Sequence, residues 1–257
     1  MHAGSSQHAS KACVMRGAVI TVAGHKGGVG KTTIAYELAA ALDGVMVDLD
    51  FHGGGATNLW GFNSRSARRA PLLDALESGG VPRPKRRPNR PPLVPSHPDL
   101  SAAELDADEI ADALERWSIA WAPRPIVVDT HPGAHFTTDG ALQAADLVVV
   151  PVPPSRRAIA AVREMLYEHS GFRIMLVPNM VSRSPREWWL QALEGFAEDP
   201  LVHLAPAISL HPWLNDRLLT TPVVAQTRPG RRTEHAASQF RAVASHIAQL
   251  CQTTAAS

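Results

Sequence analysis

The stretch GHKGGVGKTT at residues 24–33 decides the fold of this chain. It follows the apolar run AVITVA at 18–23, which predicts a buried strand. It precedes IAYELAAAL at 34–42, whose spacing and helix-forming residues predict a helix. Glycines let backbone N–H groups converge on phosphate oxygens, and the N-terminus of a helix adds the positive end of its dipole. A strand, a glycine loop, Lys-Thr and a helix therefore predict a phosphate-binding loop.

The side chains of this loop indicate a nucleoside triphosphate with magnesium as the ligand. Lys31 is placed to reach the β- and γ-phosphates, and the hydroxyl of Thr32 is placed to bind Mg²⁺. The residues expected to contact the nucleotide through this loop are Gly27, Gly28, Val29, Gly30, Lys31, Thr32 and Thr33.

A second lysine distinguishes the loop. The first glycine of the pattern G-x-x-x-x-G-K-[ST] would fall where the chain has His25, and Lys26 stands just before the double glycine. In this respect the loop resembles that of the ParA/MinD family of deviant Walker A ATPases. The resemblance implies a P-loop NTPase fold, ATP with Mg²⁺, and a homodimer that encloses two ATP molecules. It also implies that Lys26 reaches the nucleotide bound by the partner subunit.

The rest of the chain alternates between predicted strands and helices. Apolar runs predict further strands, the last of them at a sheet edge: 44–50, 125–129, 146–152, 172–177 and 202–208. Helical spacing predicts helices over 72–76, 101–117, 159–169, 187–197 and 233–250. Ser101 and Glu104 predict a capping box at the start of the helix over 101–117. Near-continuous Val/Ile/Leu strands between helices predict an α/β fold with a mostly parallel, twisted sheet and helices on both faces.

Carboxylates end two of these strands, where P-loop chemistry requires them. Asp129 follows the apolar residues 126–128, and Asp48 and Asp50 end the strand over 44–50. The resemblance implies that Asp129 orders Mg²⁺, that Asp48 lies nearer the metal, and that Asp50 orients the attacking water. Lys26, Lys31, Asp50 and Asp129 are thus the expected catalytic residues, and Thr32, Asp48 and Asp129 the expected metal site.

The segment after Asp50 departs from the family pattern. Phe51 and His52 replace a proline and a glutamine, and residues 53–55 (GGG) replace Gly-Asn. These changes bear on the rate of hydrolysis more than on nucleotide binding, so the sequence does not predict that rate. Farther on, His131 and His135 have the spacing of zinc ligands on a helix. However, Pro132 and Gly133 break such a helix and no third ligand is placed, so zinc is not expected.

The similarity extends over roughly residues 17–250. The runs LVPSHPDL (93–100) and AADLVVVPVPPS (144–155) resemble family segments, as does the Asn-x-Val of VPNMV (177–181). The last resemblance implies that Asn179 reads the edge of the adenine, with Pro206 and Ile208 packed near the base.

The length and composition of the chain indicate how many domains it forms. Its 257 residues are 45% hydrophobic and 19% charged, which suffices for one α/β domain over 17–251. Residues 1–16 are expected to be a disordered extension, 81–92 a basic proline-rich insertion, and 252–257 a polar tail. No apolar run reaches the roughly 20 residues needed to span a bilayer, and no signal-peptide core is visible. A cytoplasmic, nucleoid-associated protein is the expectation.

The net charge of +1 does not indicate a nucleic-acid-binding protein. The functional hypothesis therefore depends on the family resemblance and on local clusters of charge. The favoured hypothesis is a partition ATPase for a plasmid or chromosome, whose ATP-bound dimer binds DNA without sequence preference and is released when a centromere-bound, ParB-like partner stimulates hydrolysis. The arginines favoured for phosphate contacts are Arg183, Arg186, Arg217, Arg228, Arg231 and Arg232.

Two alternatives remain at this stage. One is a MinD-like ATPase that acts at a membrane, which the lack of a basic amphipathic helix at the end of the chain disfavours. The other is a nucleotide-gated scaffold with little hydrolysis, which the altered segment after Asp50 favours.

Overall fold

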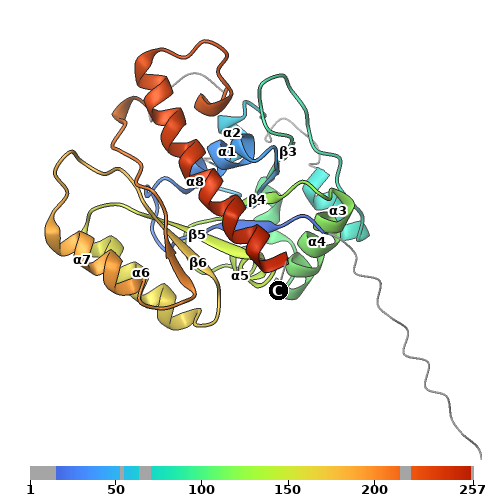
Figure 1. Cartoon of the computed structure of the whole chain (residues 1–257). Coiled ribbons are helices and arrows are strands. Elements are labelled where there is room, and N and C mark those ends of the chain that lie inside the picture. Colours follow the sequence, from blue (N-terminus) through green and yellow to red (C-terminus); the bar gives the residue numbers. More distant parts are fainter. Residues whose placement is uncertain (1–15, 53–54, 64–70, 215–220, 256–257) are drawn as a thin grey trace, which may run out of the picture.

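The structure is a computed structural model that describes residues 16–52, 55–63, 71–214 and 221–255. Its centre is a sheet of seven parallel strands in the order β3-β2-β4-β1-β5-β6-β7 (Figure 1). The strands are β1 (Val19–Val22), β2 (Val45–Asp48), β3 (Leu93–Val94), β4 (Ile126–Asp129), β5 (Leu147–Val152), β6 (Ile174–Pro178) and β7 (Val202–Leu204). The α/β fold with a parallel sheet predicted from the sequence is confirmed.

Helices cover both faces of the sheet, as the nearly continuous apolar strands require. On one face α1 (Lys31–Ala41) and α8 (Arg231–Ala255) pack together over the strands (Figure 1). The other face is covered by α3 (Pro71–Ser78), α4 (Ala107–Ala120), α5 (Phe136–Gln143), α6 (Arg156–Glu168) and α7 (Glu187–Phe196). The short helix α2 (Ala56–Leu59) and three 3-10 turns, at Pro98–Ala102, Pro212–Leu214 and Val223–Ala225, complete the described elements.

Alternation along the strands divides the core between the two faces. In β1, Ile20 and Val22 pack with α1 and α8, whereas Val19 packs with the helices of the opposite face. The same division holds for β5. Val149 packs on the face covered by α1 and α8, and Val148 and Val150 pack on the opposite face. Both sets are buried, so the apolar residues on both sides of each strand contribute to the hydrophobic core.

The start of α4 corrects one prediction. Ser101 lies in the 3-10 turn Pro98–Ala102, and α4 begins only after Asp106. The Asp106 carboxylate accepts the Glu109 N–H at 2.9 Å, while the Glu109 carboxylate accepts the Asp106 N–H at 2.9 Å. The capping box expected at Ser101 and Glu104 is therefore wrong. The Asp-x-x-Glu pattern at Asp106 and Glu109, five residues on, caps the helix instead.

The proline-rich segment 81–92 has no helix or strand among its residues, only a single antiparallel bridge from Lys85 to Leu93. Its cations pack back on the protein. The guanidinium of Arg87 lies 4.8 Å from the centroid of the Trp60 ring, and Arg90 donates to the carbonyl oxygen of Trp60 at 2.5 Å. Trp60 in turn donates its indole N–H to the carbonyl oxygen of Pro91 at 2.8 Å. These contacts hold the segment against the body of the protein.

Helices α4 and α5 approach each other closely at a glycine. A Cβ atom on Gly140 would lie 2.3 Å from the carbonyl oxygen of Ala107 and 2.6 Å from the Cβ of Ile110. We therefore expect Gly140→Ala to lower the free energy of unfolding by about 1–3 kcal/mol, the usual cost of overpacking. Urea denaturation measures the change. The control is Gly195→Ala in α7, where a Cβ meets nothing within 4 Å and helix propensity predicts a small gain. Equal stability of the wild type and Gly140→Ala would contradict the close approach.

Candidate nucleotide-binding site

The candidate site lies at the carboxyl ends of the central strands, where β1 leads through residues 23–30 into α1. Gly30 caps α1 with φ 96°, and Gly28 has φ 75°, conformations that glycine adopts without strain. A Cβ on Gly27 or Gly28 would meet nothing within 4 Å, so the loop is open to its surroundings at these two residues. This open cradle of glycine backbone at a helix N-terminus fits a phosphate chain.

Lys31, the first residue of α1, is held between the loop and the carboxylates. Its side chain is buried, and Nζ donates to the carbonyl oxygen of Lys26 at 3.0 Å. Burial lowers the pKa of Lys31, and the nearby charges of Asp129 and Asp50 oppose that shift. The ammonium group is therefore fixed beside the place where phosphate oxygens would lie. Lys26 itself is exposed on the outer part of the loop.

Asp48 and Asp129 stand side by side, since they are register partners in β2 and β4. Asp48 accepts the backbone N–H groups of Thr57 at 2.6 Å and of Asp50 at 2.9 Å. Burial raises the pKa of Asp48 to about 6 against these hydrogen bonds. Burial and then the adjacent Asp48 charge raise the pKa of Asp129 well above its usual range, while a hydrogen bond from Thr32 lowers it. Two carboxyl groups thus share a buried site, and the nearby charge of Lys31 only partly offsets the rise in the pKa of Asp129.

The carboxyl pair fits a magnesium ion. Among the described residues, Asp129 Oδ1 is buried and has no hydrogen-bond partner, although Oδ2 accepts the Ala56 N–H at 3.3 Å. A buried carboxylate oxygen without a donor is a ligand ready for a cation. Mg²⁺ prefers such oxygen ligands together with phosphate oxygens, and Thr32 supplies a hydroxyl on the same side. The three residues Thr32, Asp48 and Asp129, which the sequence suggests as a metal site, therefore lie together.

Aromatic rings surround the third carboxylate. Asp50 Oδ1 lies 3.2 Å from Nδ1 of His131, which in turn lies 3.2 Å from Nδ1 of His52. The ring of Phe51 stacks on His131 at 4.7 Å between centroids. His135 is not part of this arrangement through its nitrogen atoms, because it caps α5 by accepting the Thr137 N–H. Asp50, which follows β2, is thereby held against His131 on the loop that follows β4.

Sequence reasoning missed this cluster because it compared His131 only with His135. A usable signal was present. Asp50 and His131 each stand two residues after a carboxylate that ends a strand, at Asp48 and Asp129. Because parallel neighbouring strands end at the same edge of a sheet, residues at equal offsets beyond them come together.

The residues suggested for the base lie on the other side of α1. Asn179 follows β6, is buried, and donates its amide to the carbonyl oxygen of Val29 at 2.8 Å. It lines a small cavity of about 30 Å³ together with Gly30, Thr33 and Ile208. Pro206 is exposed and is not among the residues that line this cavity. The structure therefore brings Asn179 and Ile208 beside the loop but leaves Pro206 outside the cavity.

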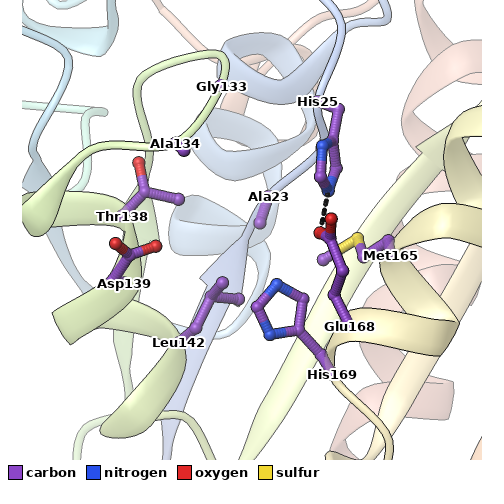
Figure 2. A pocket seen from close by; sticks show the side chains of 11 residues that line it. Ala23, His25, Gly133, Ala134, Thr138, Asp139, Leu142, Met165, Glu168 and His169 are labelled. Atoms are coloured by element: carbon purple, nitrogen blue, oxygen red, sulfur yellow. Dashed lines mark ion pairs between the residues drawn. The ribbon is translucent and has the colours of Figure 1, made fainter.

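A larger cavity of about 100 Å³ opens on the opposite flank of the loop (Figure 2). Ala23, Gly24 and His25 form one wall, and Thr138 and Asp139 of α5 form another. The remaining wall comes from the end of α6, where Met165, Glu168 and His169 line the space. None of the expected nucleotide-binding residues lines this cavity, so it is separate from the phosphate cradle.

The arginines suggested for DNA contacts lie in two parts of the chain. Arg183 and Arg186 precede α7, Arg228 precedes α8, and Arg231 and Arg232 are its first two residues; all five are exposed. The guanidinium of Arg232 lies 5.2 Å from the centroid of the Trp213 ring. Arg217 lies outside the described residues.

The fold and the site together define a P-loop nucleotide-binding protein. Residues 17–174 match a family model described as an AAA domain. The chromosome partitioning protein ParA of Caulobacter vibrioides is 30% identical over 177 residues, which are 63% of this chain and 66% of that protein. An uncharacterized protein of Mycobacterium tuberculosis is 32% identical over 217 residues, 79% of this chain and 57% of that protein.

Among solved structures, the ATP complex of a McdA variant from Cyanothece matches with a TM-score of 0.73 at 17% identity, covering 92% of this chain and 97% of that chain. The chain belongs to the ParA/MinD family of P-loop ATPases. Its alignment spans two thirds or less of the length of the two curated relatives above. Within the described residues, no helix has the length and apolarity needed to cross a bilayer.

Proposed function

We propose that this protein is a ParA-type partition ATPase, which binds ATP as a dimer and holds DNA without sequence preference until hydrolysis releases it. The observation that carries the proposal is the open glycine cradle beside the buried Asp48–Asp129 pair, with Lys31 fixed between them. The similarity to a chromosome partitioning protein supports the same assignment.

The position of each site residue suggests its role in binding or hydrolysis. Lys31 and the N–H groups of residues 27–33 would bind the triphosphate, and Thr32, Asp48 and Asp129 would hold the magnesium ion. That ion, when bound, supplies charge neutralisation for the phosphates. Asp50 would orient the attacking water. Its carboxylate lies beside His131 and is partly exposed, so a water molecule could reach it. The exposed Lys26 would stabilise the charge on the nucleotide of the partner subunit.

Lys26 gives the sharpest test of the dimer. We expect Lys26→Gln to bind ATP with wild-type affinity, because Lys31 and the loop backbone remain. We expect it to lose ATP-dependent dimerisation and to reduce turnover about 10²- to 10³-fold, as loss of one electrostatic stabiliser typically does. Analytical ultracentrifugation and phosphate release measure the two effects. Normal hydrolysis by Lys26→Gln would show that the lysine has no role across the dimer.

DNA binding is tested with an arbitrary duplex and purified protein in ATP or ADP at several salt concentrations. We expect binding only in ATP, with an affinity that falls as salt rises, because phosphate contacts release counterions. Arg228→Ala should weaken binding to all sequences alike and reduce the salt slope by about 1. The matched control, Arg116→Ala, removes an exposed arginine of α4 outside the candidate set. Equal binding in ATP and ADP would refute the proposal.

One observation favours a second candidate, a nucleotide-gated scaffold with little hydrolysis. Asp50 Oδ1 lies 3.2 Å from His131 Nδ1, so the residue proposed to orient water already has a partner. ATP-dependent dimerisation and DNA binding without measurable phosphate release, even with a partner protein present, would favour this candidate. ATP-dependent binding to liposomes in place of DNA would instead indicate a MinD-like role.

A further inference from the structure

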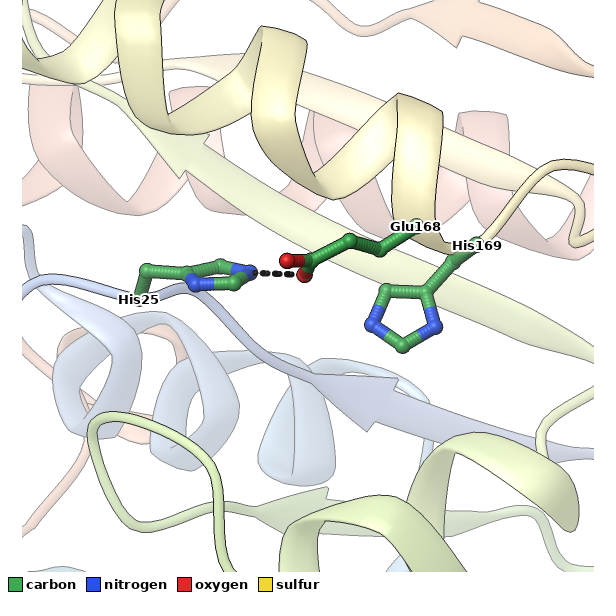
Figure 3. Close-up of side chains that lie close together, drawn as sticks. All are labelled: His25, Glu168 and His169. Carbon is green, nitrogen blue, oxygen red and sulfur yellow. Dashed lines mark ion pairs between the residues drawn. The ribbon is translucent and has the colours of Figure 1, made fainter.

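Three potential metal ligands meet beside the phosphate-binding loop, outside the proposed nucleotide site. They are His25 of the loop, Glu168 in the last turn of α6, and His169 at its C-cap (Figure 3). One ligand atom from each residue lies within 4.8 Å of the others. Nε2 of His25 points at the Glu168 carboxylate, 3.5 Å from Oε2, and the ring of His169 lies on the other side of that carboxylate (Figure 3).

These separations suit a shared ion better than direct pairing. A charge-assisted hydrogen bond between a ring nitrogen and a carboxylate is about 2.7–2.9 Å long. Ligands bonded to zinc at about 2.0–2.2 Å in a tetrahedron are instead roughly 3.3–3.6 Å apart. The His25–Glu168 distance of 3.5 Å falls in the second range. A ligand atom of His169 lies within 4.8 Å of those of His25 and Glu168, and Glu168 is exposed.

The surroundings favour a cation with an open coordination position. His169 ends α6, a helix of 13 residues, so the negative end of the helix dipole is directed at the site. All three residues line the cavity of about 100 Å³, across which Asp139 adds a further acidic group (Figure 2). Two imidazoles, one carboxylate and space for a water molecule form a typical zinc set with one open position.

The other group of this kind among the described residues, Asp50 with His52 and His131, is less suitable. Its imidazole rings are stacked at 4.3 Å with planes only 21° apart. Each ring plane contains the lone pair of its own nitrogen, so these two stacked rings hold their lone pairs in separate, nearly parallel planes. They cannot both point at an ion about 2.0–2.1 Å from each nitrogen without a large rotation of one ring.

We propose that His25, Glu168 and His169 bind a divalent transition-metal ion of the zinc class, with the fourth position open to the cavity. The site joins the loop to the end of α6. Because His25 directly precedes Lys26, whose carbonyl oxygen accepts from Lys31, a bound ion would fix the first half of the phosphate-binding loop. The proposal does not depend on the ATPase function, since the three ligands need no nucleotide.

The test uses untagged, metal-free protein without nucleotide, titrated with Zn²⁺ by calorimetry and with Co²⁺ by visible absorption. We expect wild-type protein to bind one equivalent in this site and to give the intense absorption of four-coordinate Co²⁺. Glu168→Gln and His169→Gln should each weaken binding at least about tenfold, since loss even of an outer-shell partner often costs that much. Both residues lie outside the phosphate cradle, and circular dichroism checks that the variants fold.

The control is His52→Gln, which removes a ligand from the stacked group and should leave the Zn²⁺ affinity unchanged. The assignment is overturned if wild-type protein binds no Zn²⁺, or if Glu168→Gln and His169→Gln bind it as tightly as wild type. It is equally overturned if His52→Gln alone abolishes binding, which would place the ion beside Asp50.

Discussion

Asp129→Asn is expected to make the nucleotide-free protein more stable and, at the same time, unresponsive to ATP with magnesium. Asp129 is fully buried beside Asp48, and one of its oxygens lacks a hydrogen-bond partner among the described residues. An asparagine can still accept the Ala56 N–H but carries no charge. We expect a gain of at least about 1 kcal/mol, or roughly 2–4 °C in Tm.

The gain should depend on pH in a defined direction. Burial raises the pKa of Asp129 well above its usual range and that of Asp48 to about 6. Between the ordinary carboxyl pKa and these values the folded state holds more protons than the unfolded state, so stability falls as pH rises. The stability difference between Asp129→Asn and wild type should therefore be small near pH 4 and widen as pH rises toward the raised pKa of Asp129. Urea denaturation across this range measures it.

The response to ligand is the second half of this prediction. At 100 times its Kd, Mg²⁺·ATP should stabilise wild-type protein by about 2.7 kcal/mol, and Asp129→Asn should lose most of that gain. The control is Asp139→Asn, which removes an exposed carboxylate of α5 that the structure places outside the magnesium site. An Asp129→Asn protein that is less stable without nucleotide and is stabilised normally by Mg²⁺·ATP would contradict the assignment of the metal site.

Lys31→Met is expected to remove nucleotide binding almost completely. Its ammonium group is buried and held by the Lys26 carbonyl oxygen, between the glycine cradle and Asp129. Loss of one member of a buried, hydrogen-bonded charge pair costs about 2–5 kcal/mol, which is roughly a 30-fold to several-thousand-fold rise in Kd. Methionine keeps most of the buried volume, so the loss reports on charge rather than on packing.

Binding of a fluorescent ATP analogue to wild-type protein and to Lys31→Met measures the effect. The matched control is Lys26→Gln, which removes the other lysine of the loop and is expected to retain ATP affinity in the monomer. The two lysines are thereby separated, one as the ligand of its own nucleotide and the other as a group that acts across the dimer. If Lys31→Met binds ATP as tightly as wild type, the loop is not the phosphate site.

Much of the fold could be predicted because the determining signals are local. The segment 18–42 predicts a strand, a loop and a helix in order. Buried strands such as 126–129 and 147–152 are nearly continuous Val, Ile and Leu. The boundaries were less predictable where two local patterns compete. The α4 cap illustrates this, since Ser101 and Asp106 both begin a capping pattern and only Asp106 caps the helix.

The sequence by itself determined the class of fold, the phosphate-binding loop and the carboxylates that end β2 and β4, because each depends on residues close together in the chain. Only the tertiary structure decided what meets around the loop. It pairs Asp50 with His131 of the loop after β4, places Asn179 against Val29, and brings His25 to Glu168, 143 positions away along the chain. Strand order and helix packing set these contacts, and neither is encoded in any one segment.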